Sequence, residues 1–155
     1  MSYEILKFIH LISMLLLIGV GTGSAFYKYM SDKKGSVETI VHINKQIVLA
    51  DWIFTTPSAL IQPISGVALA YTLNISLLTP WLLISIILFS FSGILWLFAL
   101  YLQIKMRDIS IKALESNQPL PNSYYHYAKI WFYLGIPSFF TMFGVFVLMV
   151  FRHHF

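Results

Sequence analysis

Four long apolar segments, separated by short polar stretches, make up most of this chain of 155 residues. They run from about Glu4 to Tyr27, Gln46 to Leu73, Pro80 to Gln103 and Ile130 to Phe151. Each passes the length of roughly 20 apolar residues that a helix needs to cross a bilayer. The loops between them leave no room for a soluble domain. The sequence therefore predicts an all-α integral membrane protein, one transmembrane domain over residues 1–155, built as a four-helix up-down bundle.

Composition agrees with this class. Hydrophobic residues make up 58% of the chain and charged residues only 10%, against roughly 25% charge in an ordinary soluble domain. We therefore expect the lipid bilayer as the partner, and no nucleic acid, despite the net charge of +4. The chain has no cysteine, which excludes disulfides, zinc thiolate sites and cysteine-bound iron–sulfur clusters. The first segment is too long for a signal-peptide core and is predicted to be a retained helix.

The basic residues predict the orientation. Eight of the ten fall in the first and third loops: Lys28, Lys33, Lys34, Lys45, Lys105, Arg107, Lys112 and Lys129. Lys7 and Arg152 lie on the opposite side. Since basic loops stay in the cytoplasm, both of these loops are predicted to be cytoplasmic and both termini to face outward, in a multi-pass protein of the cell inner membrane.

Two polar side chains fall inside the second apolar segment, Asp51 and Gln62. An ionised carboxylate in hydrocarbon costs a few kcal/mol, so such residues usually face a partner, a cavity or a cofactor. We expect Asp51 to face the bundle interior. The sequence leaves its state open: it is neutral, paired with Lys45 or another basic loop residue, or hydrogen-bonded to Tyr or Trp donors from other segments.

His10 lies inside the first segment and is the strongest candidate for cofactor chemistry. A neutral histidine in an apolar helix is a natural axial ligand of haem iron, a metal ligand or a proton-relay group. The alternative is a core histidine hydrogen-bonded to a neighbouring helix. At a similar depth the fourth segment offers Met142 or Met149 as a second iron ligand, and the second offers Gln62 somewhat deeper. The remaining alternatives are an open sixth position or a ligand from another chain.

His42 is the candidate for a second haem on the cytoplasmic side, where a second candidate cluster is formed by His42, Asp51, His126, Tyr124, Tyr125 and Tyr127. His42 and Asp51 are nine residues apart, so on a regular helix they lie on roughly opposite faces and are not expected to pair. The alternative is that His42 and His126 are ordinary interfacial histidines. His153 and His154 are interpreted as a solvated tail.

Small residues in the first segment form two overlapping patterns, Gly19 with Gly23 and Gly21 with Ala25, which let helices approach closely. The favoured interpretation is packing within one chain. The alternative is a homodimer seam.

Several blocks of the chain resemble an uncharacterised family of bacterial predicted integral membrane proteins, a domain of unknown function. The blocks that carry the resemblance are residues 6–11, 19–23, 50–57, 62–66, 79–82, 102–107, 131–137 and 148–150. The Asp51-Trp52 block is the most specific. More remotely, the chain is similar to the J-type protoporphyrinogen oxidases and the copper-resistance D membrane proteins, which share a histidine early in a first span. This resemblance implies a haem-linked or metal-linked role, carried over only onto His10.

Two function classes follow. One is a membrane protein that binds haem b between its helices near His10 for a redox role. The other is a cofactor-free bundle, either a proton or metal-ion transporter acting through Asp51 and Gln62 or an accessory subunit of a larger membrane complex.

Overall fold

The computed structural model describes residues 2–151, and all of its regular elements are helices. In chain order they are α1 (Tyr3–Lys34), α2 (Val37–Ala50), the π-helical turn η1 (Asp51–Thr55), α3 (Thr56–Thr72), α4 (Pro80–Glu115) and α5 (Asn122–Val150). Because α2, η1 and α3 follow one another without a break, they form one long helix, Val37–Thr72. The four resulting helices are each long and apolar enough to cross a membrane, which confirms the all-α membrane fold.

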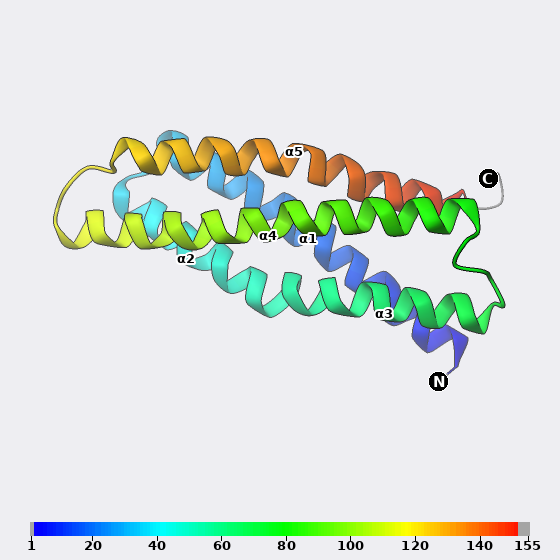
Figure 1. Ribbon diagram of the computed structural model, residues 1–155. Helices are drawn as coiled ribbons and strands as arrows, with labels where there is room; N and C mark the ends of the chain where they lie inside the picture. Colours follow the sequence, from blue (N-terminus) through cyan, green and yellow to red (C-terminus); the bar gives the residue numbers. More distant parts are fainter. Residues whose placement is uncertain (1, 152–155) are drawn as a thin grey trace.

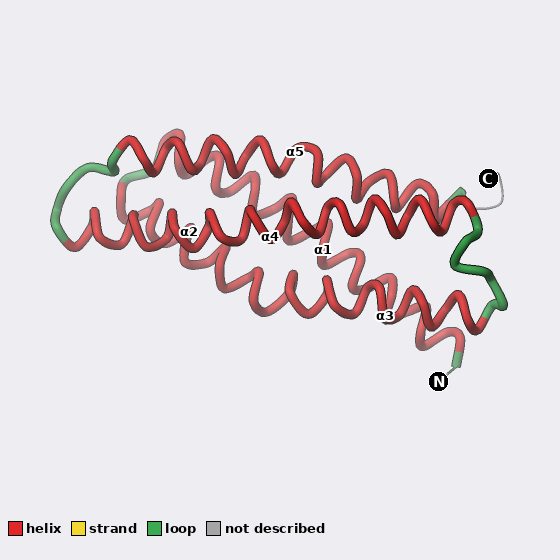
Figure 2. The backbone as a smooth tube through the Cα atoms, in the orientation of Figure 1, coloured by secondary structure: helices red, strands yellow, loops and turns green. Residues whose placement is uncertain are grey.

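The helices run alternately up and down, with the connections at the two ends of the molecule (Figures 1 and 2). Helices α4 and α5 pack along each other, and α1 packs mainly against α3 and α2. The start of α1 and the end of α5 lie at the same end of the bundle (Figure 1). We call this the terminal end, and the opposite end, which carries the α4–α5 loop, the loop end.

A short turn joins α3 to α4. Thr79 stands at the N-cap position and Pro80 begins α4, where its missing N–H would have no helical partner. The Thr79 hydroxyl donates to the Ser76 carbonyl at 2.7 Å and does not cap the helix.

Two predicted loops are helical in the structure. Residues 28–35 were predicted as a polar loop, but α1 continues to Lys34. Helix α4 likewise continues to Glu115, and α5 begins at Asn122, well before Ile130. The prediction was wrong because these extensions carry one buried face: Lys28 and Asp32 pair one turn apart, and Met106 and Tyr124 are fully buried.

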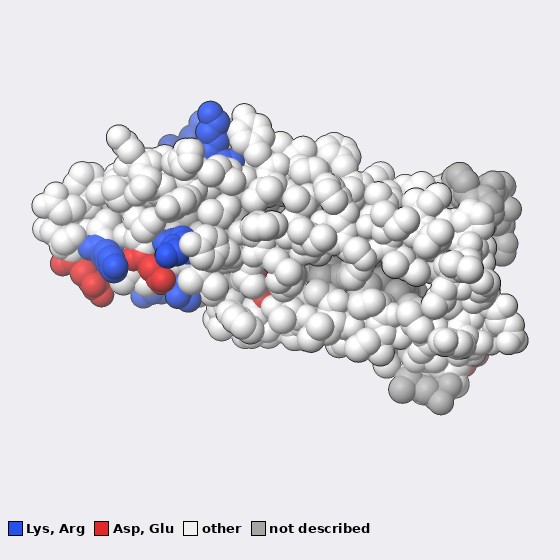
Figure 3. Space-filling model, viewed as in Figure 1, with Lys and Arg blue, Asp and Glu red and all other residues white. Residues whose placement is uncertain are grey.

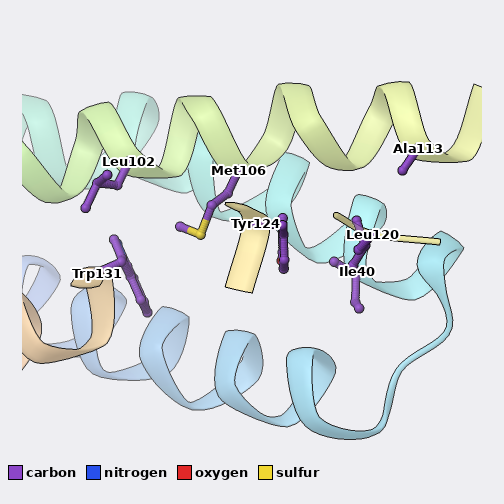
Figure 4. Packing of buried hydrophobic residues seen from close by; sticks show 7 residues of the cluster. All are labelled: Ile40, Leu102, Met106, Ala113, Leu120, Tyr124 and Trp131. Carbon is purple, nitrogen blue, oxygen red and sulfur yellow. The ribbon is translucent and has the colours of Figure 1, made fainter. Parts of the chain in front are cut away.

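The extended helices enclose a hydrophobic core at the loop end. Its members come from α2, α4, α5 and the α4–α5 loop, and Figure 4 shows their side chains converging: Ile40, Leu102, Met106, Ala113, Leu120, Tyr124 and Trp131. Lys, Arg, Asp and Glu side chains gather around this end, whereas the remaining surface in view is almost entirely uncharged (Figure 3). Large exposed apolar side chains such as Phe8, Leu15 and Ile64 are suited to contact with lipid tails.

The glycines of α1 make no close contact with another helix. A Cβ added at Gly19, Gly21 or Gly23 would meet nothing within 4 Å. The close packing within one chain that the sequence favoured is therefore not found at these three glycines, whereas Ala25 packs against the core at the loop end. The homodimer seam stays a prediction.

Candidate functional site

Asp51 lies at the one interruption of regular α-helical geometry in the helix Val37–Thr72. It begins the π-turn η1, and the Thr56 N–H bonds back to the Asp51 carbonyl, five residues earlier. Pro57 follows at once; it lacks an N–H and its ring crowds the carbonyl four residues before it, so a widened turn here has a direct local cause. Such π-turns are frequent at functional sites.

The Asp51 side chain faces the bundle interior, as predicted, with only 3% of the residue exposed. The Thr55 hydroxyl donates to its Oδ1 at 2.7 Å. Gln103, on α4, lines the same cavity as Asp51. Among residues 2–151 the ion pairs are Lys28–Asp32 and Arg107–Asp108, so Asp51 has no cationic partner there, and the pairing with Lys45 that the sequence left open is absent.

A cavity of about 400 Å³ opens beside Asp51, between α1, the η1–α3 segment, α4 and α5. Its walls are mostly apolar and aromatic. The lining residues are Leu17, Ile18, Gly21, Thr22, Ser24, Ala25, Asp51, Thr55, Ala59, Phe89, Ser92, Gly93, Leu95, Trp96, Ala99, Gln103, Trp131, Phe132, Leu134, Gly135, Ile136, Ser138, Phe139, Phe140 and Met142. We call this the Asp51 cavity.

Four buried polar atoms on residues of the Asp51 cavity have no hydrogen-bond partner: Asp51 Oδ2, Gln103 Oε1, Trp96 Nε1 and Trp131 Nε1. Two of them accept hydrogen bonds and two donate. Leaving a buried polar atom unpaired costs about 1–3 kcal/mol, and native interiors rarely do so. Because all four atoms belong to residues of one cavity, this cavity is a candidate site for a ligand whose polar groups would form the missing hydrogen bonds.

His10 belongs to a different group of side chains, shared by α1 and α3. Its Nδ1 lies 2.9 Å from Ser65 Oγ, and its Nε2 lies 3.1 Å from the Gln62 amide nitrogen. The Ser65 hydroxyl donates to the Ile61 carbonyl, so it accepts from His10 Nδ1–H, and Nε2 accepts from Gln62. The Ser13 hydroxyl donates to Gln62 Oε1. The structure therefore gives His10 hydrogen-bond partners on a neighbouring helix, the alternative that the sequence left open.

A second cavity, of about 330 Å³, lies beside His10 at the terminal end. Met149 lines it together with His10 and Lys7, whereas Met142 lines the Asp51 cavity. Of the two methionines considered as a second iron ligand, Met149 is thus the one that shares a cavity with His10. Gly66 faces the ring closely, because a Cβ there would come within 3.1 Å of His10 Cε1.

The histidines of the loop end lie apart from both cavities. His42 and His126 are exposed, and His42 does not pair with the buried Asp51, as the spacing predicted. Residues 2–151 hold no group of three or more His, Cys, Asp or Glu side chains arranged to bind a metal ion. His153 and His154 lie outside the described residues.

Sequence reasoning missed a buried polar network at the loop end, centred on Lys28 (1% exposed). The Lys28 ammonium donates to Asp32 at 2.9 Å, to Asn44 Oδ1 at 3.0 Å and to the Tyr124 hydroxyl at 2.8 Å. The Tyr124 hydroxyl donates to Asp32 at 2.6 Å, and the Asn44 amide donates to Ser110 at 3.1 Å. We call these five residues the Lys28 network; they join α1, α2, α4 and α5. The sequence offers two signals for it: the four-residue spacing of Lys28 and Asp32, and Tyr124, which was placed in a cytoplasmic-side cluster but with other partners.

The fold and the two cavities define the chain as a four-helix membrane protein with polar groups buried between its helices. Residues 4–153 match the family described as predicted integral membrane protein, DUF2269, and the chain belongs to that family. No curated protein and no solved structure matches the chain. The comparisons thus confirm the family resemblance and give no support to the remoter similarity to protoporphyrinogen oxidases or copper-resistance D proteins.

Proposed function

We propose that this protein binds a small, largely apolar molecule within the membrane, in the Asp51 cavity. The observation that carries the proposal is the set of four buried polar atoms without partners on residues of this cavity. Binding sites for small molecules are commonly apolar concavities in which a few polar groups fix the orientation of the ligand. The aromatic walls would hold the apolar body, while Asp51, Gln103 and the two indoles would hold the polar head.

A fluorescence experiment tests the proposal. Replacing Trp52 and Trp81 by Phe leaves Trp96 and Trp131 as the remaining tryptophans, and both line the Asp51 cavity. We expect the neutral quencher 1,4-dibromobenzene to quench their emission along a saturable curve in purified, detergent-solubilised protein. A Gly135→Leu substitution should abolish saturation, since it places a side chain on a cavity residue whose added Cβ meets nothing within 4 Å.

Gly19→Leu is the matched control. Gly19 also has open space around an added Cβ, but it does not line the cavity. Its variant should keep the saturable curve. Quenching that rises linearly with 1,4-dibromobenzene, and equally in both variants, would show only partition into the micelle and would overturn the proposal.

Haem b near His10 is a second proposal, favoured by the shared cavity of His10 and Met149. A histidine–methionine pair is a known axial set for haem iron. In this structure His10 Nε2 already accepts from Gln62, so ligation would require that hydrogen bond to be exchanged for iron. The test is an absorption spectrum: a Soret band that His10→Ala removes and His42→Ala retains supports haem here. A band retained in His10→Ala contradicts this site, and a wild-type spectrum without a Soret band contradicts the proposal.

We also propose the orientation that the charges favour, with the loop end in the cytoplasm and the protein in the cell inner membrane. The gathering of charged side chains at that end supports it (Figure 3). A reporter fused after Phe155 should be active only outside the cytoplasm. Activity confined to the cytoplasm would reverse the orientation.

A further inference from the structure

We propose that the ligand of the Asp51 cavity is an amphipathic amine, bound as a cation whose ammonium group pairs with Asp51. This inference rests on the proposed function and names the ligand's chemical class. It is argued from the charge of the cavity, from the hydrogen-bonding atoms left open in it and from the character of its walls.

The charge of the cavity is the first argument. Among its lining residues, Asp51 is the one with an ionisable side chain, because no Lys, Arg, His or Glu belongs to the set. A buried carboxylate is costly unless a positive charge pairs with it. The chain supplies such a partner elsewhere: Lys28, equally buried, pairs with Asp32 at 2.9 Å. For Asp51 the structure supplies only the neutral Thr55 hydroxyl, so the missing positive charge is assigned to the ligand.

The open acceptors are the second argument. Asp51 Oδ2 and Gln103 Oε1 both accept hydrogen bonds, both are buried, and neither has a partner. A protonated primary amine carries three N–H donors and a secondary one carries two, so one such ammonium group can donate to both atoms. A hydroxyl group has a single hydrogen to donate and brings no charge.

The walls of the cavity define the rest of the molecule. Phe89, Phe132, Phe139 and Phe140 also line the cavity, which suits an aryl or alkyl body attached to the amine. The indoles of Trp96 and Trp131 leave two N–H donors open. An ether or carbonyl oxygen near the amine would accept from them.

The test uses a matched pair of competitors, 4-phenylbutylamine and 4-phenylbutan-1-ol, which differ at one end in an ammonium or a hydroxyl group. Each displaces 1,4-dibromobenzene from the protein that retains Trp96 and Trp131. We expect the amine to compete more strongly than the alcohol. Asp51→Asn should lower the affinity of the amine by about tenfold or more, as expected when one partner of a desolvated charge pair is removed. The affinity of the alcohol should change much less.

Asp108→Asn is the control, since it also removes one carboxylate but lies exposed and outside the cavity. The Asp108→Asn variant should bind both competitors with the affinities of the parent protein. If quenching by 1,4-dibromobenzene saturates but the amine and the alcohol compete equally, in the parent protein and in Asp51→Asn, the amine proposal is overturned. The proposal of a binding cavity is then unaffected. If 1,4-dibromobenzene never saturates, the proposed function itself fails. Should Asp51→Asn not fold, the wild-type comparison of amine with alcohol still decides between these outcomes.

Discussion

Two buried polar regions of this molecule differ in whether their charged group has an oppositely charged partner. In the Lys28 network the ammonium donates to three side chains, and Tyr124 and Asn44 link it to the other helices. In the Asp51 cavity a carboxylate of similar burial keeps one oxygen unpaired, beside an amide and two indoles that are also incomplete. The first region is complete without a ligand, and the second is not.

This difference between the two regions predicts that one stabilises the fold and the other binds a ligand. A satisfied polar network fixes how helices pack, and removing one member leaves the others buried and unpaired. An incomplete cluster costs free energy in the empty protein, which a ligand can recover. We therefore expect substitutions in the Lys28 network to change the free energy of unfolding, and substitutions in the Asp51 cavity to change binding.

Lys28→Ala should have the largest effect of the substitutions considered. It removes the cation that pairs with Asp32 and one hydrogen-bond partner each from Asn44 and Tyr124. Breaking a buried pair in this way costs about 3–5 kcal/mol. The measurement is the free energy of unfolding in mixed detergent micelles, followed by far-ultraviolet circular dichroism. Lys33→Ala is the control, because Lys33 is exposed in the same helix; equal losses in both variants would contradict a stabilising role for the network.

Tyr124→Phe should have a smaller effect of the same sign. The Tyr124 hydroxyl accepts from Lys28 and Asn44 and donates to Asp32, and its loss leaves these groups underpaired. We expect a loss of about 1–3 kcal/mol in the same assay. Tyr125→Phe is the neighbouring control on an exposed ring. A stable Tyr124→Phe variant would show that the hydroxyl is dispensable and that Tyr124 acts through its packing alone.

The sequence predicts well the features that depend on composition along one helix. Apolar length gives the four helices, and the cost of a carboxylate in hydrocarbon gives the inward direction of Asp51. It fails at Lys28, because a run of polar residues next to an apolar segment is typical of a loop. Only packing against α2, α4 and α5 makes that stretch a buried helical face.

Which residues line the cavity depends on how the helices are aligned along and around one another. A single sequence does not carry that information. Gln103 and Trp96 lie on α4, Trp131 on α5 and Asp51 on η1, and their meeting depends on tilt and on the π-turn before Pro57. The same limit applies to the methionines. Met142 and Met149 were both compatible with the depth of His10, and the packing of α5 decides that Met149 shares its cavity.

The last prediction makes the same substitution in both regions. Asp32→Asn removes the charge that pairs with Lys28 and should destabilise the protein by about 3 kcal/mol, since the ammonium stays buried. Asp51→Asn removes a carboxylate that has no cationic partner, and its side-chain oxygen can still accept from Thr55. We expect the free energy of unfolding of this variant to be unchanged or to rise by about 1 kcal/mol, as when a functional site is relieved of an unpaired group. Equal destabilisation by the two variants would mean that Asp51 holds the helices together as Asp32 does, and the contrast between the two regions would be lost.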